Sequence, residues 1–419
     1  MGAGILGLDP ALLTAVARRV GTPTYVYGAN LIRAQYHALE DALRAAGAPN
    51  RICYAIKANG SLAVLRVLKG LGAGADIVSL GELERAHRAG FPPESIVFSG
   101  VGKTADELDA AITSCVGQIN IESPSELDAV IAASARVGKA AGLGIRVNPD
   151  VQTNTHPYTK TGDKTAKFGV PFDEVVTVAQ RIKAQPRLKL KGLAMHIGSQ
   201  ITEVDPYRRG TLKLLELVAA VRAAGVTTIE NVDVGGGLGV RYHDEKVPAL
   251  KDWVDAVAPP IRAAGLTLHC EPGRFLVANA GLLLTRVLYQ KHAGGKDYVV
   301  VDAGMTDFVR PSHYNAYHEI IPLGDTGKHE RTVNVVGPIC ESGDFLALDR
   351  KLPQVAPGDV LAVLGTGAYG FVMSSTYNAR PRPPEVLVEG DKYYVARERE
   401  TIEDLFRGEV LEPRGWYNS

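Results

Sequence analysis

Short apolar runs rich in β-branched residues alternate with longer stretches of helical period from about residue 51 to residue 273. Ser123 and Pro124 open one such stretch as at a helix start, and Gly90 and Gly138 end others like C-terminal caps. Eight strands alternating with helices predict a (β/α)₈ barrel, although an open doubly wound sheet gives the same alternation. The predicted strands span residues 51–58, 75–79, 95–100, 118–123, 143–149, 191–198, 231–237 and 267–273.

Polar residues and glycines gather at the C-terminal ends of these predicted strands. In a barrel such ends converge on one mouth, whereas in an open sheet they would be strung along an edge. The pattern therefore favours an α/β fold with an N-terminal (β/α)₈ TIM barrel. The residues concerned are Lys57, Asp76, Glu122, Arg146, His196, Gly235, Gly236, Gly237 and Glu271.

After residue 273 the pattern changes to strand-like runs separated by Gly, Pro and Asp turns. This change predicts a second, C-terminal and mostly antiparallel β domain. The segment TPTYVYG, residues 22–28, is also strand-like and can join it. We therefore expect a barrel at residues 25–275 and a β domain made of residues 1–24 and 276–419.

The amino-acid composition limits which kinds of binding partner are expected. Lysine plus arginine and aspartate plus glutamate both number 46, so the formal net charge is zero. A balanced charge gives no electrostatic reason to expect nucleic acid or an anionic membrane as a partner. Apolar runs fall short of a membrane span, and the N-terminus lacks a basic start and an apolar signal core. The four cysteines form no C-x-x-C pair, so we expect a cytoplasmic protein without a bound metal.

Lys57, in the segment YAIKANG, is the first candidate for chemistry. A lysine at a strand end is more often a solvated terminus, so a reactive role depends on its neighbours at the mouth. The segment GGGLG, residues 235–239, lets backbone N–H groups approach an anion such as a phosphate; its structural alternative is a tight turn. It does not match the dinucleotide-binding pattern G-x-G-x-x-G.

The segment EPGR, residues 271–274, closes the eighth predicted strand. Glu271 can hold the nitrogen of a pyridine ring protonated, and Arg274 can bind a phosphate or a carboxylate through two hydrogen bonds. The segment HIGSQ places His196 and Ser199 after the sixth strand, where an imidazole can stack on a ring and a hydroxyl can donate to phosphate. Each residue alone has an ordinary structural explanation, so the functional interpretation depends on the whole set.

The predicted β domain carries candidates of its own. The segment GPICESGD places Cys340 and Glu341 in a Gly/Pro-rich turn, where packing explains a cysteine beside a carboxylate poorly. Two further segments, at residues 307–320 and 367–383, add Arg310, Tyr314 and Tyr369.

Taken together and in order, these motifs closely resemble those of the fold-type III, alanine-racemase-like decarboxylases that use pyridoxal 5′-phosphate (PLP). Within that group they resemble the diaminopimelate decarboxylase family, over nearly the whole chain. The resemblance implies a PLP-binding barrel, a β domain that completes the active site, and a homodimer with active sites at its interface. The motifs that carry it are YAIKAN, NTHPYTKTGDKTAKFGV, HIGSQ, GGGLG with EPGR, RPSHYNAYH and GPICESGDFLALDR.

The same resemblance implies roles for residues of the barrel. Lys57 corresponds to the lysine that forms a Schiff base with PLP, and Glu271 to the partner of the pyridine nitrogen. His196 corresponds to the residue stacked on the ring, while Asp76 and Arg146 match positions that order the lysine and ring surroundings. Positions that bind the cofactor phosphate match Ser199, Gly235, Gly236, Gly237 and Tyr369. Gly273 and Arg274 are further cofactor-binding positions.

For the substrate, the resemblance implies a small amino acid, meso-2,6-diaminopimelate, converted to L-lysine and carbon dioxide in the last step of lysine biosynthesis. Cys340 matches a proton donor supplied by the partner subunit, and whether it or Lys57 delivers the final proton stays open. Substrate-binding positions match Arg274, Arg310, Tyr314, Glu341 and Tyr369.

Diaminopimelate has two amino-acid ends, so decarboxylating one end requires a site that holds the other. Arg274 and Arg310 can take the distal carboxylate, and Glu341 can take the distal ammonium. Ornithine and arginine decarboxylases of this fold need only a cation site. At the position where this chain has Cys340-Glu341, their pattern has a Cys-Asp turn.

Several alternatives to this substrate and this reaction stay open. One is a related decarboxylase of basic amino acids or of carboxynorspermidine. A racemase should carry a catalytic tyrosine where GPICE lies. A non-catalytic PLP carrier of this fold typically consists of the barrel alone, so the second domain argues against it.

Overall fold

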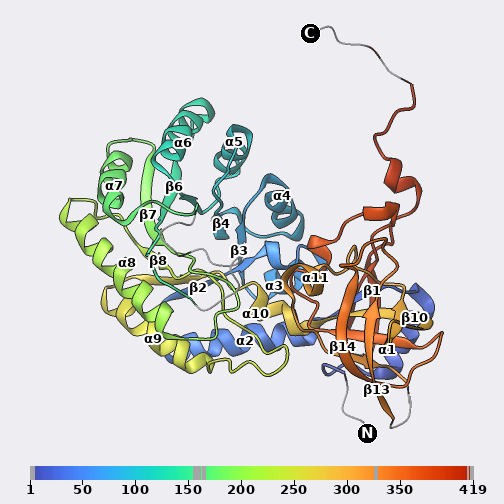
Figure 1. Ribbon diagram of the computed structural model, residues 1–419. Helices are drawn as coiled ribbons and strands as arrows, with labels where there is room; N and C mark the ends of the chain where they lie inside the picture. Colours follow the sequence, from blue (N-terminus) through green and yellow to red (C-terminus); the bar gives the residue numbers. More distant parts are fainter. Residues whose placement is uncertain (1–4, 154–161, 163–166, 325–328, 413–414, 416–419) are drawn as a thin grey trace. The chain divides into compact units, whose positions relative to one another are not determined.

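Eight parallel strands close into a barrel, with the last strand pairing back to the first. This closure confirms the predicted barrel and excludes the open sheet. In the computed structural model, the barrel helices surround the strands (Figure 1). The strands are β2 (Asn50–Ala55), β3 (Gly74–Ile77), β4 (Ile96–Phe98), β5 (Gln118–Ile121), β6 (Ala141–Arg146), β7 (Leu188–Ala194), β8 (Asn231–Asp233) and β9 (Thr267–Cys270).

The helices before, between and after these strands bury apolar side chains, as their spacing predicts. In α6 the Ser123 side chain accepts the N–H of Glu126, and Pro124 occupies the first turn. Gly90 and Gly138 end α4 and α6 in the left-handed conformation, as expected of glycine caps. The helices are α2 (Ala29–Ala45), α3 (Leu62–Gly70), α4 (Leu80–Ala89), α5 (Ala105–Thr113), α6 (Pro124–Val137), α7 (Val175–Lys183), α8 (Asp205–Ala223), α9 (Leu250–Ala263) and α10 (Arg274–Val277).

The barrel strands end earlier than the sequence predicts. The first strand stops at Ala55 rather than continuing to residue 58, and Lys57 lies in a following 3₁₀ turn, Ile56–Ala58. The prediction that Lys57 ends a strand is therefore wrong by two residues. Apolar content extends into this turn because Ile56 and Ala58 are buried there, and burial alone does not distinguish strand from turn.

The interior of the barrel is polar over part of its length. Asn231 on β8 donates a hydrogen bond to Gln118 on β5, although β6 and β7 separate these strands around the barrel. Two such strands can meet only through the interior, so both side chains point inward. Because strand side chains alternate between faces, Asn120 and Asp233, two residues further on, share the inward face.

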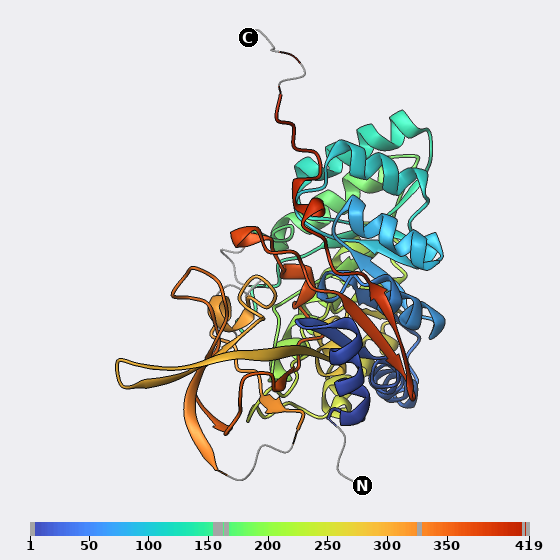
Figure 2. The same ribbon diagram turned by 90° about the vertical axis from the view of Figure 1, so that its right-hand side faces the viewer.

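A second sheet is mostly antiparallel, with a parallel pairing between β11 and β13. The strand order is β14-β13-β11-β10-β1-β16-β17, and β15 pairs with both β10 and β12. Figure 2 shows the β10–β11 hairpin as a long gold ribbon. The strands are β1 (Thr24–Gly28), β10 (Gly281–Ala293), β11 (Lys296–Val301), β12 (Ile320–Pro322), β13 (Glu330–Val336), β14 (Phe345–Pro353), β15 (Val360–Leu364), β16 (Glu385–Glu389) and β17 (Lys392–Arg397).

Two helices belong with this sheet, α1 (Pro10–Val20) and α11 (Arg310–Tyr314). Leu13 and Val16 of α1 pack in one core with Val26, Leu282 and Val386 from three strands. The N-terminal segment and the C-terminal third of the chain thus share a hydrophobic core.

The structure describes residues 5–153, 162, 167–324, 329–412 and 415. The chain divides into two compact units. We call residues 28–280 and 367–372 the barrel unit, and residues 1–27, 281–366 and 373–419 the β unit. Most of the motif NTHPYTKTGDKTAKFGV, at residues 154–161 and 163–166, lies outside the described residues. Among the helices described, none is both long and apolar enough to cross a membrane.

Candidate active site

Lys57 forms an ion pair with a buried carboxylate at the barrel mouth. Its Nζ lies 2.5 Å from Oδ2 of Asp76, which is fully buried at β3. About one third of the Lys57 side chain (32%) stays exposed. Enclosure by the barrel favours the neutral amine, but the charges of Asp76 and Glu271 outweigh it and raise the pKa of Lys57. Asp76, which the resemblance matches to a position that orders the lysine surroundings, is thus in direct contact with Lys57. Its role stays a prediction.

Two further carboxyl groups lie near this ion pair. Burial, followed by the charge of Asp76, raises the pKa of Asp233 to about 7, even though Asp233 accepts the N–H of Gly235 at 2.8 Å. Burial and the charges of Asp233 and Asp76 likewise raise the pKa of Glu271 well above its usual range. Among the described residues, Asp76 Oδ1 and Asp233 Oδ2 have no hydrogen-bond partner. The cluster therefore has more acidic groups than Lys57 alone can balance.

His196 lies beside the glycine segment as a neutral imidazole. Its Nδ1 accepts the N–H of Gly236 at 3.2 Å, which leaves the ring proton on Nε2. Enclosure and the charges of Arg146 and Lys57 lower the pKa of His196 well below its usual range. A neutral ring suits the predicted stacking role better than a charged ring would.

The glycine segment 235–237 is required by the packing of the mouth loops. A Cβ on Gly236 would overlap the carbonyl oxygen of Glu271, and one on Gly237 would overlap that of Gly198. Gly235 and Gly237 also adopt φ values of +71° and +94°. The N–H groups of Gly235 and Gly236 donate to Asp233 and His196. Backbone packing therefore explains these glycines without an anion.

Arg146 forms a second buried ion pair at the mouth. Its Nη1 donates to Oε1 of Glu122 at 2.9 Å, and its guanidinium lies 4.7 Å from the ring of Phe168. Glu122 also accepts the N–H groups of Gly100 and Gly169. Glu122 stands out in the sequence as a charged strand end, but its role in holding Arg146 was not predicted.

Arg274 brings together several residues that the sequence assigns to anion binding. Its Nη2 donates to Ser199 Oγ at 3.0 Å and its Nη1 to the Tyr242 hydroxyl at 2.7 Å. Its guanidinium also lies 4.8 Å from the ring of Tyr369. The N–H of Tyr369 donates to the carbonyl of Ala58, which places this tyrosine beside the Lys57 turn. Tyr242 was missed because a tyrosine in a polar loop gives no distinct signal.

A cavity of about 390 Å³ opens among these side chains. It combines apolar walls with a few charged groups, as small-molecule sites commonly do. Its lining includes Lys57, Val78, Ser99, Asn120, Arg146, Phe168, Met195, His196 and Glu271.

The β unit holds the remaining candidates in two places. Arg310 and Tyr314 lie on α11, with the guanidinium 5.5 Å from the tyrosine ring. Arg310 Nε also donates to Nε2 of His318 at 3.4 Å, and His318 itself is fully buried. The two predicted substrate-binding side chains of this helix are therefore in contact.

Cys340 and Glu341 are exposed in a turn that other residues organise. The carboxylate of Asp344 accepts the N–H of Ile339 at 2.6 Å, and the N–H of Cys340 donates to Asn378 Oδ1 at 2.8 Å. The motif GPICESGD thus contacts Asn378, which belongs to the segment 367–383, within the β unit. An exposed thiol on a fixed turn is accessible for proton transfer.

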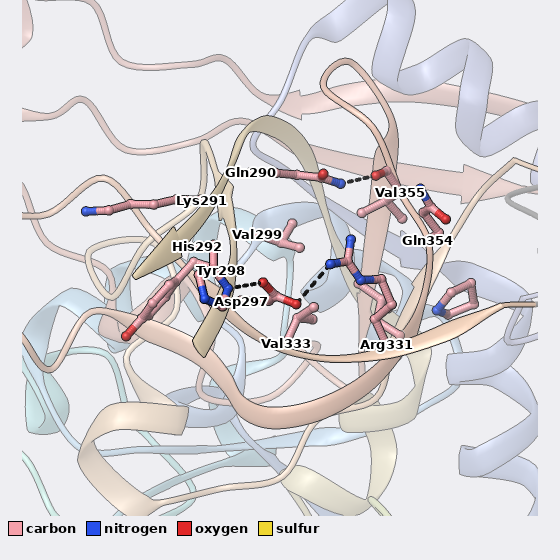
Figure 3. Close-up of a pocket in the computed structure, with 12 residues that line it drawn as sticks. Gln290, Lys291, His292, Asp297, Tyr298, Val299, Arg331, Val333, Gln354 and Val355 are labelled. Carbon is pink, nitrogen blue, oxygen red and sulfur yellow. Dashed lines mark hydrogen bonds and ion pairs between the residues drawn. The ribbon is translucent and has the colours of Figure 1, made fainter. Parts of the chain in front are cut away.

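A second pocket, of about 180 Å³, lies in the β unit between the β10–β11 hairpin and strands β13 and β14 (Figure 3). Asp297 lies 2.7 Å from His292 Nδ1 and 3.0 Å from Arg331 Nη2. The hydrogen bond from His292 and the charge of Arg331 lower the pKa of Asp297. His292 and Arg331 already pair with the acid in this pocket, unlike the acids of the barrel.

Comparison with known proteins identifies the family. Residues 29–278 match the family described as "Pyridoxal-dependent decarboxylase, pyridoxal binding domain". The chain is 48% identical to diaminopimelate decarboxylase of Pseudomonas aeruginosa over 402 residues, which cover 96% of each protein. It is 44% identical to the Aquifex aeolicus enzyme over 96% of this chain and 94% of that one. This chain belongs to the diaminopimelate decarboxylase family.

Solved structures of the family agree in fold. Diaminopimelate decarboxylase of Helicobacter pylori, crystallised with L-lysine, superimposes with a TM-score of 0.90 at 39% identity. That match covers 94% of this chain and 98% of the Helicobacter chain. The family resemblance drawn from the sequence motifs is therefore confirmed, as is the fold class of a TIM barrel with a mostly antiparallel β domain.

The cofactor of this family is pyridoxal phosphate, and the charges in the barrel fit it. A protonated pyridine nitrogen is the kind of cation that the surplus acids Asp76, Asp233 and Glu271 can balance. A phosphate is the kind of anion that Arg274 and Ser199 can bind. In the part of the chain that the structure describes, no cluster of His, Cys, Asp or Glu is suited to hold a metal ion.

Proposed function

We propose that this protein is a PLP-dependent carboxy-lyase that converts meso-2,6-diaminopimelate to L-lysine and carbon dioxide, the last step of lysine biosynthesis. Membership of the family supports the reaction. The observation in the structure that carries the proposal is a cavity lined by Lys57, His196 and Glu271. The same barrel unit holds the hydrogen-bonded pair Arg274 and Ser199.

Residues of the barrel would hold the cofactor by charge and by contact. Lys57 would hold its aldehyde carbon, Glu271 its ring nitrogen, and Arg274 with Ser199 its phosphate. When bound, PLP supplies an electron sink for the charge that remains on the substrate α-carbon after carbon dioxide leaves. His196, kept neutral, gives a flat polar surface for the ring without adding a positive charge.

The protein's own contribution is to orient the substrate and to move one proton. Arg310 and Tyr314, which are in contact, suit the distal carboxylate of the substrate. Glu341 suits its distal ammonium. Cys340, exposed on its fixed turn, or Lys57 delivers the proton to the α-carbon. Arg310 and Glu341 together select a substrate with two amino-acid ends over free ornithine or free arginine.

Activity on meso-diaminopimelate tests this function directly. The purified protein with added PLP should release carbon dioxide and form L-lysine. Lys57→Ala should lose the absorbance of the bound cofactor and at least roughly 10³-fold in turnover, because both attachment and proton transfer use this amine. Lys69→Ala, at an exposed position of α3, is the matched control and should keep full activity.

Two outcomes would count against the proposal. Activity that survives Lys57→Ala would overturn the mechanism. A protein that ignores meso-diaminopimelate but consumes carboxynorspermidine or another polyamine precursor would overturn the substrate.

We further propose a homodimer in which Cys340 of the partner subunit serves each barrel. Mixing two inactive variants, Lys57→Ala and Cys340→Ala, should then restore activity, since each mixed dimer contains one intact site. Random reassociation predicts about a quarter of wild-type activity for such shared sites. Mixed variants that stay inactive, although co-purification of differently tagged subunits shows exchanged dimers, would argue that each chain completes its own site.

The protein has four free cysteines, which suits a reducing compartment. We therefore propose a cytoplasmic location for the reaction. Fractionation of the source cells with an activity assay on meso-diaminopimelate tests it.

A further inference from the structure

A line of hydrogen bonds runs through the barrel interior and ends at Glu271. Asn231 Nδ2 donates to Gln118 Oε1 at 3.0 Å, and Gln118 Nε2 donates to Asn120 Oδ1 at 2.8 Å. Asn120 Nδ2 then donates to Ser99 Oγ at 3.1 Å, and Ser99 Oγ donates to Glu271 Oε1 at 3.4 Å. We call these four donor residues, Asn231, Gln118, Asn120 and Ser99, the amide chain.

The amide chain has one direction. Gln118 and Asn120 each accept through the amide oxygen from one neighbour and donate through the amide nitrogen to the next. Asn231 begins the chain as a donor, and its Oδ1 has no hydrogen-bond partner among the described residues. All the donors therefore point toward Glu271. Ser99 accepts from Asn120, which leaves its own proton for the glutamate. A carboxylate is stabilised by donors in its ionised form, and aligned hydrogen bonds polarise one another.

The barrel is built to hold these amides in place of apolar side chains. Gln118, Asn120 and Asn231 are 3%, 1% and 4% exposed, where a TIM barrel usually packs branched apolar residues. Asn120 pairs across the sheet with Gly144, and Asn231 with Gly192. A Cβ on either glycine would overlap the facing amide oxygen. Two strand glycines therefore give the amide chain its space.

Glu271 has a particular need for such donors. It is buried with Asp233 and Asp76, whose charges oppose its ionisation. A carboxyl that stays neutral would pair only weakly with a protonated ring nitrogen. The interior donors work against this tendency from the side of the barrel away from the mouth.

We propose that Ser99, Asn120, Gln118 and Asn231 act as positioning residues that keep Glu271 ionised and directed at the PLP ring nitrogen. The inference rests on the proposed function, because it requires PLP in the barrel. It assigns to interior residues, which do not bind the substrate, a share of the electronic tuning of the cofactor.

The test measures dissociation constants by equilibrium dialysis for PLP and for its analogue with carbon in place of the ring nitrogen. The wild-type protein should prefer PLP, because only PLP pairs with Glu271. Ser99→Ala should weaken PLP binding by roughly five- to tenfold and leave analogue binding within about twofold, since a hydrogen bond to a charged group is lost. Ser99→Thr keeps the hydroxyl and should restore the preference.

Further variants separate a chain from independent contacts. Asn120→Ala should reduce the preference less than Ser99→Ala, because Ser99 can still donate to Glu271. The double variant should be no worse than Ser99→Ala alone, since the chain is already broken at its last bond. Ser134→Ala removes a buried serine on α6 that donates to the carbonyl of Lys139, and this control should change neither constant.

The competing results are distinct. If Ser99→Ala weakens PLP and the analogue equally, the serine has only a packing role and the inference fails. If Ser99→Ala changes neither constant, the amide chain does not act on Glu271. If the wild-type protein binds neither compound, the proposed function fails as well; if it binds both equally, the proposed role of Glu271 fails and the inference fails with it.

Discussion

The barrel unit and the β unit each hold an acidic group with charged neighbours, and the two behave in opposite ways. Asp233 in the barrel is fully buried, and the burial raises its pKa to about 7. Asp297 in the β unit lines a pocket beside His292 and Arg331 (Figure 3), and these two residues lower its pKa. The chemical group is the same, so the environment alone sets the direction.

The difference shows which pocket is ready for a charged ligand. In the pocket of the β unit, Asp297 is already paired with the side chains of His292 and Arg331, which are largely exposed to water. The barrel keeps carboxyl oxygens without a protein partner among the described residues, at a cost in stability that a bound cation can offset. Unbalanced buried charge is thus the more useful indicator of a functional site.

The largest change in the pH dependence of stability is expected from Asp233→Asn in protein freed of PLP. A carboxyl group whose pKa is raised in the folded protein contributes to stability at pH values below its unfolded pKa. For Asp233 this stability is lost as the pH rises through about 7, the raised pKa. Asparagine still accepts the N–H of Gly235 but cannot ionise. The variant should therefore gain on the order of 3 kcal/mol over wild type between about pH 4 and about pH 8.

Urea unfolding of the whole protein at both pH values measures this gain. Equal pH profiles for wild type and variant would mean that Asp233 is ionised at little cost. The buried carboxyl would then be no different from Asp297.

A smaller effect with the opposite pH dependence is expected from His269→Gln. Burial, with the charges of Arg51 and Lys191, lowers the pKa of His269 to about 3. A histidine with a lowered folded pKa contributes stability above its unfolded pKa of about 6.5, and this is lost as the pH falls. Wild type should therefore lose roughly 2 kcal/mol relative to the variant between about pH 6.5 and about pH 4.

Thermal unfolding across this range, with the exposed His243→Gln as a control, measures the difference. The His243 variant should follow the wild-type profile throughout. A His269 variant that also follows it would show that this ring is protonated inside the fold.

The smallest effect is expected from Asp297→Asn. Because the pKa of Asp297 is lowered in the folded protein, the aspartate contributes to stability at pH values above its unfolded pKa. That stability is lost as the pH falls through the lowered pKa. Because its partners are exposed, the unfolding midpoint should move by no more than about 2 °C, and added salt should abolish the shift. Asp391→Asn, in the exposed turn between β16 and β17, gives the baseline. A large shift that persists in salt would show that this pocket is not screened by water.

The barrel mouth could be predicted from the sequence because parallel strands share a direction. A residue at the end of one strand then lies near residues at the ends of the others, as Lys57, Asp76 and Glu271 do. The exact end of the first strand could not be predicted. Its turn is held by contacts from Gly367 and Tyr369, about three hundred residues away in the chain.

The amide chain could not be recognised from its segments. Gln118 and Asn120 alternate with isoleucines, which is the pattern of a strand with one face in water. Only the closure of all eight strands turns that face inward. A related signal was present in NVDV, where Asn231 and Asp233 alternate with buried valines, and two such strands in one barrel point to a polar interior.

The contacts of the segment 367–372 also affect the order in which the site can form. Asn59 Nδ2 donates to the carbonyl of Gly367 across 308 positions of the chain, and Ala58 accepts from Tyr369. A growing chain could complete all eight barrel strands by residue 270 and still lack these partners of the Lys57 turn. The reactive lysine would then be set in place only after the ribosome had made most of the β unit. Synthesis order would in that way delay cofactor capture until the protein is nearly whole.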